Sequence, residues 1–202
     1  MVVVCRNENG NLVKYLIEHG ADIRRENVLL SSACNWGNEN LVKYLVEHGA
    51  NINIGNSYGE TLLFNACESG NENLIKYLIE LGIDINKESK YDKTLLFHAC
   101  ICGNENLVKY LVEHGADINK ENGNGETPLF PACRWRNENL VKYLAEHGAN
   151  INKENKQHKT PIYFAYTNSK TEIVKFLVEH GAILLKKEII FFKFPKLLRK
   201  VL

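Results

Sequence analysis

The chain has 202 residues, of which 45% are hydrophobic and 24% are charged, and its formal net charge is +1. This balance is typical of globular proteins, and it excludes a wholly disordered chain, a collagen and a disulfide-dense mini-protein. A nearly neutral chain has no overall field that would attract nucleic acid, so we expect no nucleic-acid partner. The charge is uneven, because residues 183–202 carry six basic residues against the single acid Glu188.

The sequence shows no targeting segment that would place the chain in a membrane or outside the cell. The apolar run Val2–Val4 is too short for a signal-peptide core, and no run of 18 or more residues lacks a charge. Six cysteines without a secretory signal are typical of reduced thiols rather than of a disulfide framework. We therefore expect a cytoplasmic protein.

A five-residue motif recurs along the chain with almost constant spacing. Leu-Val-Lys-Tyr-Leu or a close variant begins at residues 12, 41, 74, 107, 140 and 173, so the step is 29 residues once and 33 residues four times. A period of this length indicates a stacked array of small structural units. We place a truncated first repeat at 1–21, followed by repeats at 22–54, 55–87, 88–120, 121–153 and 154–182, and a tail at 183–202.

Each repeat predicts two helices and a long turn. In the repeat 55–87, Thr61 suits the start of a short helix, and Gly70 suits its end. Asn71 is a good cap for a second helix with an apolar stripe, which Gly82 should terminate. The connections between the helix pairs are polar and contain turn dipeptides, such as Tyr58-Gly59. Neither helix can bury its stripe alone, so neighbouring repeats must stack.

These features resemble the ankyrin repeat. The family's Thr-Pro-Leu-His-x-Ala signature is close to Thr-Pro-Leu-Phe-Pro-Ala at 127–132, and its Gly-Ala-x-Ile-Asn ending occurs at 115–119. The resemblance covers residues 1 to about 182. It implies an all-α repeat fold, an ankyrin-type α-solenoid of helix-turn-helix units with projecting hairpin loops. It also implies protein–protein binding without catalysis and without a cofactor.

Several departures from the family pattern bear on stability. Phe or Tyr replaces the signature histidine in four repeats, which should remove a bond between that histidine and the threonine hydroxyl. Pro131 lies about four residues into a predicted helix, opposite the carbonyl of Thr127, where a proline can cost about 3 kcal/mol but costs less near a helix start. Arg136 and Ser169 replace helix-ending glycines. We expect the repeats 121–153 and 154–182 to be the least stable, and the short link 22–29 to blunt the first hairpin.

Two columns, each made of the residues that occupy one position in successive repeats, raise the question of metal or catalytic chemistry. Residues at one position of consecutive repeats should lie roughly 8–10 Å apart, which is too far for a disulfide or a shared ion. We therefore interpret the cysteine column as buried packing and the histidine column as helix ends. Cys102 lies outside the column and points away from Cys100. No catalytic triad or phosphate-binding loop is present, so we expect no enzyme activity and no metal site. The columns are Cys5, Cys34, Cys67, Cys100 and Cys133, and His19, His48, His114, His147 and His180.

Other positions vary freely between repeats and include residue types that dominate binding energy. By resemblance to the family, they should line the concave groove and the hairpin tips. The alternative is that a surface column simply varies without consequence. The predicted partner-binding residues are Trp36, Tyr58, Asn65, Glu68, Tyr91, His98, Ile101, Arg134, Trp135 and Phe164.

Two features stay open at this point. Asn86 and Asn119 stand where the family has asparagines that are hydroxylated, although each could instead bond its own hairpin backbone. The basic, apolar tail 183–202 could cap the last repeat, dock on an anionic membrane or a partner, or mark the end of a fragment. We expect a monomeric scaffold that binds an unidentified protein; the alternative is a membrane-peripheral protein that acts through its tail.

Overall fold

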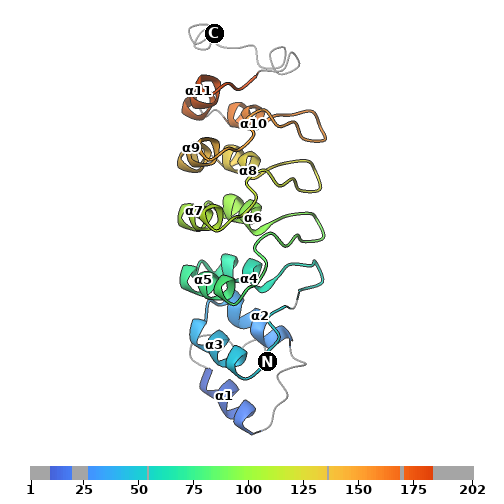
Figure 1. The fold of residues 1–202 in the computed structure, drawn as a ribbon, viewed down its shortest axis with the longest axis vertical. Helices are drawn as coiled ribbons and strands as arrows, with labels where there is room; N and C mark the ends of the chain where they lie inside the picture. Colours follow the sequence, from blue (N-terminus) through green and yellow to red (C-terminus); the bar gives the residue numbers. More distant parts are fainter. Residues whose placement is uncertain (1–9, 20–26, 54, 136, 169–170, 184–202) are drawn as a thin grey trace. The chain divides into compact units, whose positions relative to one another are not determined.

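The computed structural model describes residues 10–19, 27–53, 55–135, 137–168 and 171–183 as helices joined by turns (Figure 1). One isolated β-bridge, between Gly55 and Thr61, interrupts this pattern. The chain divides into two compact parts, residues 1–98 and residues 99–202. The boundary falls inside one continuous helix, so we describe each part by itself.

The N-terminal part contains successive pairs of short helices. α2 packs against both α3 and α4, and α4 packs against α5. Each predicted helix-turn-helix unit in this part is thus present where the structure describes it. The helices are α1 (Gly10–Glu18), α2 (Asn27–Asn35), α3 (Glu39–Glu47), α4 (Leu62–Ser69), α5 (Glu72–Glu80) and the start of α6 (Leu95–Cys102).

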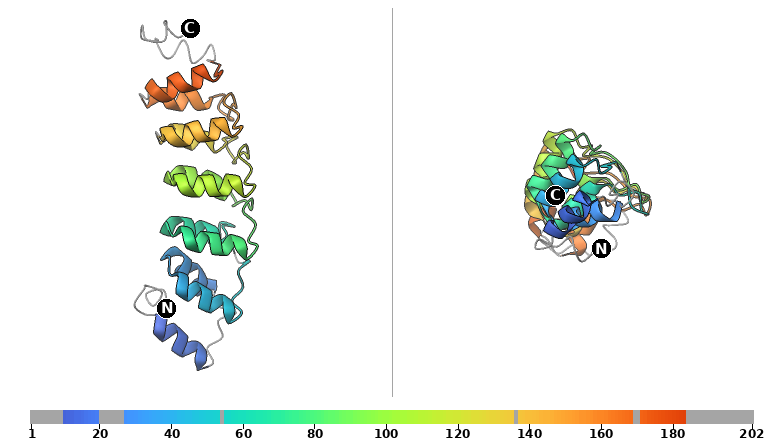
Figure 2. Two further views of the ribbon diagram at one scale, coloured as in Figure 1. Left: turned by 60° about the vertical axis from the view of Figure 1, so that its left-hand side comes forward. Right: turned by 90° about the horizontal axis from the view of Figure 1, so that it is seen from below.

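The C-terminal part repeats this arrangement. α8 packs against α9 and α10, while α9 also contacts α7 and α11. The hairpins project from the same side of the helix pairs within this part (Figure 2). Its helices are the end of α6, α7 (Glu105–Glu113), α8 (Leu129–Arg134), α9 (Glu138–Glu146), α10 (Pro161–Thr167) and α11 (Thr171–Glu179).

The recurring motif supplies the core of every described helix pair. In α5, Leu74, Ile75 and Leu78 have no exposed surface, and α4 of the same repeat packs against this helix. The first helices add small residues to this core, such as Ala66 and Cys67 of α4. The structure therefore supports the expectation that neither stripe is buried within a single helix.

Two of the asparagines that cap second helices, Asn71 and Asn137, each make two kinds of bond. The Asn71 side-chain oxygen accepts the amide of Leu74 at 3.0 Å, as predicted for a cap. Its Nδ2 also donates to the carbonyl of Gly37, 2.9 Å away in the preceding repeat. Asn137 likewise caps α9 through Leu140 and reaches the carbonyl of Gly103. Aspartate or serine could cap these helices, but neither offers the amide donor that links the repeats.

Gly37 occupies a site that a larger residue would not fit. Its φ is +65°, which L-residues rarely adopt, and an added Cβ would lie 3.1 Å from the Ser69 Oγ. Gly70 also ends its helix at a positive φ of 72°, as predicted. The repeats are therefore held at a spacing that these backbone carbonyls and glycines define.

The projecting connections are turns stabilised by their own side chains. Asn122 is buried, and its Oδ1 accepts the amides of Asn124 and Glu126 at 2.9 and 3.0 Å. Successive hairpins of this part are joined by a bond from the Lys156 amide to the Asn124 carbonyl. The predicted turns are thus present, and the hairpins form a bonded row rather than isolated loops.

Pro131 disturbs its helix less than the sequence predicts. The carbonyl of Thr127 accepts the amide of Phe130 at 2.9 Å, so it does not need the amide that a proline lacks. The same short first turn occurs at Thr61 and at Thr160, although in those repeats the position equivalent to Pro131 is not proline. The expected cost of about 3 kcal/mol for an interior proline therefore does not apply here.

The lost signature histidine has a visible consequence at Thr127. Its buried Oγ1 has no hydrogen-bond partner, and Phe130 fills the position where the family has histidine. In the repeat 88–120, the Thr94 hydroxyl instead accepts the amide of Phe97 at 3.3 Å. One threonine of the column thus caps its helix, whereas Thr127 buries an unsatisfied hydroxyl.

Asn119 does not bond its own hairpin in the way the sequence suggested. Its Nδ2 donates to the carbonyl of Gly148 at 2.9 Å, and its Oδ1 accepts the amide of Asn150 at 2.7 Å. Asn152 holds Gly181 and Ile183 in the same manner. These side chains clamp one repeat to the next, because both ends of the carboxamide are satisfied by the following repeat.

Several sequence predictions concern residues outside the described part of the chain. They are Cys5 and the other residues before Gly10, most of the short link 22–29, Arg136, Ser169, and the tail beyond residue 183. Within the described residues, no helix is both long and apolar enough to cross a membrane.

Substitutions of Asn71 should separate its two roles. Asn71→Ala should lower the free energy of unfolding by about 2 kcal/mol, because both the cap and the link to Gly37 are lost. Asn71→Asp keeps the cap but places a carboxylate against the Gly37 carbonyl, so we expect a loss of about 1 kcal/mol. Chemical denaturation followed by circular dichroism measures both values. An Asn71→Asp variant as stable as the unsubstituted chain would contradict the linking role.

The two threonines should respond differently to the same substitution. Thr94→Val removes the acceptor for the Phe97 amide and should cost about 1 kcal/mol or more. Thr127→Val removes an unpartnered hydroxyl, so stability should be unchanged or rise by up to about 1 kcal/mol. Each variant serves as the other's control in the same denaturation series. Equal losses in both variants would show that the Thr127 hydroxyl has a partner in solution.

Candidate functional site

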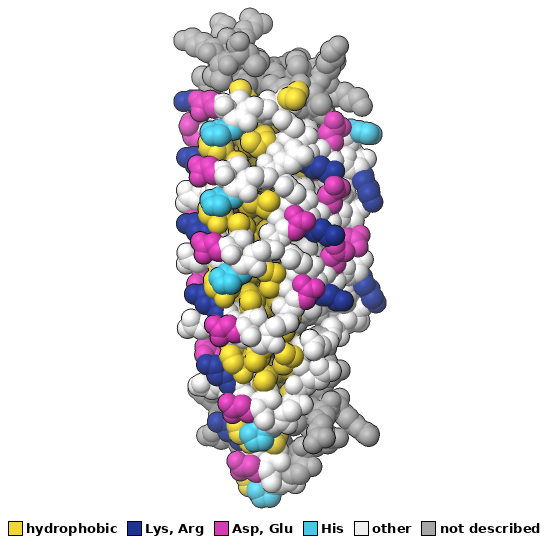
Figure 3. All heavy atoms as spheres, viewed as in Figure 1, with side chains coloured by type: hydrophobic (Ala, Val, Ile, Leu, Met, Phe, Trp, Pro, Cys, Tyr) yellow, Lys and Arg dark blue, Asp and Glu magenta, His cyan; other side chains and the backbone are white. Residues whose placement is uncertain are grey.

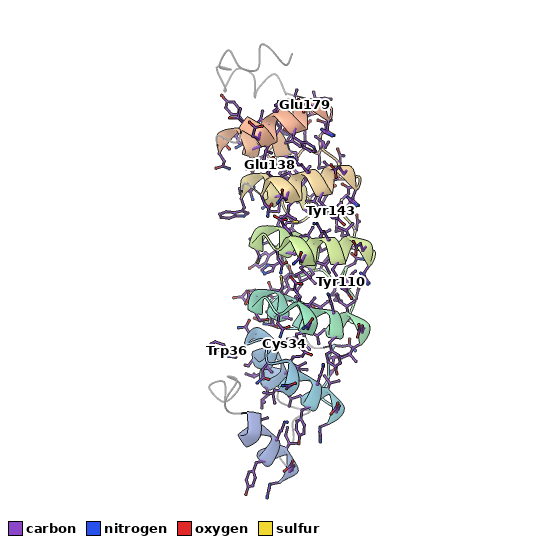
Figure 4. The ribbon with its side chains drawn as sticks, turned by 90° about the vertical axis from the view of Figure 1, so that its left-hand side faces the viewer. Cys34, Trp36, Tyr110, Glu138, Tyr143 and Glu179 are labelled. Carbon is purple, nitrogen blue, oxygen red and sulfur yellow. The ribbon has the colours of Figure 1, made fainter. Side chains whose placement is uncertain are left out.

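The predicted binding residues lie at the ends of the first helices and at the hairpin tips. Trp36 follows α2, and its side chain is 44% exposed. Figure 4 shows it projecting outward, while Cys34, two residues earlier, lies inside the helix pair. The turn that ends α2 thus displays a large aromatic side chain beside a fully buried scaffold residue.

The N-terminal part places Asn65, Glu68 and His98 on or near the surface. Glu68 is exposed, and Asn65 and His98 are half-buried. The His98 ring lies 5.6 Å from the Phe64 ring, and its buried Nε2 has no hydrogen-bond partner. Burial lowers the pKa of His98, while the charges of Glu68 and Glu60 partly oppose this change. The residue is therefore a neutral imidazole with an unused nitrogen at neutral pH.

The two tyrosines of the hairpin tips form a pair. The Tyr58 and Tyr91 rings are stacked with centroids 6.3 Å apart, and the side chains are 52% and 59% exposed. The Lys90 amide donates to the Tyr58 carbonyl at 2.7 Å, which fixes the two tips relative to each other. The structure thus brings together two residues that the sequence predicted one by one.

In the C-terminal part, Arg134 is held by its own repeat. Its guanidinium bonds both oxygens of the buried Glu126, the shorter contact being 2.6 Å. The Asn155 amide also donates to Glu126, and the guanidinium lies 4.3 Å from the centre of the Phe164 ring. Arg134 and Phe164 are therefore part of one packed cluster, with their outer surfaces still half-exposed.

Trp135 is the most exposed residue of this part's predicted site. It ends α8 and is 60% exposed, whereas its neighbour Cys133 is fully buried. Ile101, in the second half of α6, is half-buried. Trp135 thus directly follows Arg134, whose guanidinium is held by the buried Glu126.

Sequence reasoning missed three residues of this region, namely Glu126, Lys159 and Tyr163. Glu126 orients Arg134, and Lys159 lies 4.1 Å from the centre of the half-buried Tyr163 ring. The available signal was the column before each signature threonine, which alternates between acid and base as Glu60, Lys93, Glu126 and Lys159. An acid and an arginine eight residues apart gave no periodic pattern that predicts their pairing.

The histidine column is structural, as predicted. His48, His114 and His147 each donate from Nδ1 to the carbonyl four residues earlier at 2.7–2.8 Å, and each ring stacks on the tyrosine of that position. Figure 3 shows histidines recurring beside apolar side chains along this edge of the helices within each part. These contacts satisfy the carbonyls at the helix ends.

The cysteine column is also packing, as predicted. Cys34, Cys100 and Cys133 are fully buried thiols outside any disulfide. Burial raises the pKa of Cys34 to about 12 and that of Cys133 further, so neither is a thiolate near neutral pH. Cys102 is exposed.

Comparison with known proteins identifies the repeat. A family model described as ankyrin repeats in three copies matches residues 1–89, 30–122 and 96–188, so the matches together extend over most of the chain. No curated protein matches the sequence. Ankyrin repeats are generally protein–protein interaction modules and are typically non-catalytic. The helix-turn-helix pairs, the projecting hairpins and these matches agree, and the chain belongs to the ankyrin repeat family.

Proposed function

We propose that this chain is a non-catalytic, monomeric scaffold that binds one protein partner through its variable surface. This surface consists of the ends of the first helices and the hairpin tips, with Trp36, Tyr58 and Tyr91 in one part and Trp135 in the other. We also propose that it acts in the cytoplasm and needs no cofactor for binding.

The observation that carries the proposal is the contrast between two neighbouring columns. The scaffold positions Cys34 and Cys133 have no exposed surface, yet two residues later Trp36 and Trp135 are 44% and 60% exposed. Tryptophan is enriched among residues that dominate binding energy, and about half of each ring stays in solvent, where that surface adds no burial energy to the fold. A partner that covers these rings would supply that burial.

The surroundings indicate what the partner must offer. Arg134 is already paired with the buried Glu126, so the carboxylate of Glu126 largely neutralises its charge. The tips present two stacked tyrosines, which combine apolar faces with hydroxyl groups. We therefore propose a partner that contributes apolar side chains to the tryptophans and hydrogen-bonding groups to the tips, rather than a strongly charged ligand.

Alanine substitution of the two tryptophans tests the proposal. Trp36→Ala and Trp135→Ala should each weaken partner binding by about 30-fold, because a central aromatic anchor contributes roughly 2 kcal/mol or more. Helicity should be unchanged, since both side chains lie largely outside the core. The partner is first captured from lysate with the full chain, and affinities are then measured by calorimetry with the purified partner.

Tyr15→Ala is the matched control. Tyr15 is also an aromatic residue that is more than half exposed, but it lies on α1, a second helix, away from the proposed surface. Its removal should leave affinity unchanged. Full affinity of the Trp36→Ala and Trp135→Ala chains would refute the assignment, and loss of capture by a chain ending at Ala182 would instead place binding in the tail.

A further inference from the structure

Lys159 is a half-buried cation whose ammonium group pairs with no acidic side chain among the described residues. The ammonium lies 4.1 Å from the centre of the Tyr163 ring. Lys142 and Lys153 in the same part of the chain each bond a glutamate, at 2.7 and 2.6 Å. A partly desolvated ammonium without an acid is the group that a carboxylate from another molecule complements best.

Comparison with the preceding repeat explains why Lys159 has no acidic partner. Glu126 occupies the equivalent position there and bonds Arg134, eight residues later. Eight residues after Lys159 the chain has Thr167, which carries no charge. Both oxygens of Glu126 are already used by Arg134, and one also accepts the Asn155 amide. The acid nearest in the column is therefore committed within its own cluster.

Two touching aromatic rings connect Lys159 to Arg134. The Tyr163 and Phe164 rings meet edge to face with centroids 5.3 Å apart, and the Arg134 guanidinium lies 4.3 Å from the centre of the Phe164 ring. Arg134 uses two of the five N–H donors of a guanidinium on Glu126, so further donors remain. The surface thus combines an unpaired ammonium, hydrogen-bond donors and aromatic faces.

We propose that Lys159 binds the carboxylate of an aspartate or glutamate side chain of the protein partner. This inference rests on the proposed function and adds the chemistry of the partner: a segment with an acid for Lys159 and an apolar side chain for Trp135. Because Glu126 already neutralises Arg134, the unbalanced charge is that of one lysine. One carboxylate balances this charge, and a strongly anionic segment is not required.

The backbone around Lys159 is held in place before any partner arrives. Its amide donates to the Asn155 Oδ1 at 3.0 Å, and its carbonyl accepts the Asn155 amide at 2.9 Å. The contact with Tyr163 also restricts the ammonium group. A lysine that is positioned in this way loses less conformational freedom on forming an ion pair than a fully mobile lysine does.

Selection of peptides from a random displayed library tests the proposal on the full chain. We expect the enriched peptides to carry an excess of Asp or Glu over the unselected library, and Lys159→Met should abolish this excess. Calorimetry with one purified acidic peptide should give a dissociation constant about fivefold higher for Lys159→Met. About 1 M salt, which shortens the Debye length to about 3 Å, should weaken binding to the unsubstituted chain by a similar factor.

Lys153→Met is the matched control. It also removes a lysine from the connection between α9 and α10, but Lys153 is paired with Glu121. The excess of acidic residues in the selected peptides should be unchanged. Lys159→Glu should instead shift the excess from acidic to basic residues, because the carboxylate would repel an acid. Methionine retains the apolar stem of lysine, so circular dichroism should show that Lys159→Met keeps its fold.

Two results would overturn the assignment of Lys159. One is a set of enriched peptides that depends on Trp36 and Trp135 but has no excess of acids. The other is an excess of acids that persists in both Lys159→Met and Lys159→Glu. Either result would leave the proposed function intact. If no peptide is enriched, or if enrichment does not depend on the two tryptophans, the proposed function and this inference fail together.

Discussion

The fold depends on one constraint: a helix of eight or nine residues cannot bury its apolar stripe or its terminal polar groups by itself. Isolated helices of this length are marginal in water, because nucleation costs more than a few bonds return. Leu74, Ile75 and Leu78 have no exposed surface in the folded chain, where α4 packs against their helix, α5. The position of each repeat is therefore set by its neighbours, and its sequence is constrained wherever it touches them.

The polar groups obey the same constraint as the apolar stripe. Asn71 caps its own helix with its oxygen and satisfies the helix-end carbonyl of Gly37 with its nitrogen. Asn119 uses both ends of its carboxamide on the next repeat. These bonds are directional, so they fix the spacing and rotation that the non-directional hydrophobic contacts leave loosely defined. Stacking in this family thus combines burial with a regular set of amide links.

Features within one repeat could be predicted from the sequence. The cap at Asn71, the helix end at Gly70 and the buried cysteine column follow from local rules, namely capping, positive φ and helical periodicity. The cost at Pro131 was overestimated, because periodicity does not show that the Thr127 carbonyl already accepts the Phe130 amide. The predicted site residues were found by variability between repeats, and their exposure depends on the turn that follows each first helix.

Contacts between repeats could not be predicted, because aligned columns compare residues 33 apart. The structure shows partners at other separations: Asn119 bonds residues 29 and 31 positions later, and Asn71 bonds a residue 34 positions earlier. Reasoning from columns alone thus identified the residues that recur, but it could not identify which residues of neighbouring repeats bond one another.

One repeat position illustrates how such a scaffold acquires different functions. Ser69 and Asn168 occupy this position and turn inward, where their side chains donate to the carbonyls of Ala66 and Phe164. Trp36, Cys102 and Trp135 occupy it in other repeats and are exposed. The helix end tolerates both, because the backbone amides that follow α2 and α8 make their own bonds to Ser32 and Pro131. A position that the fold does not need for capping is thereby available for other side chains, and two repeats use it to expose a tryptophan.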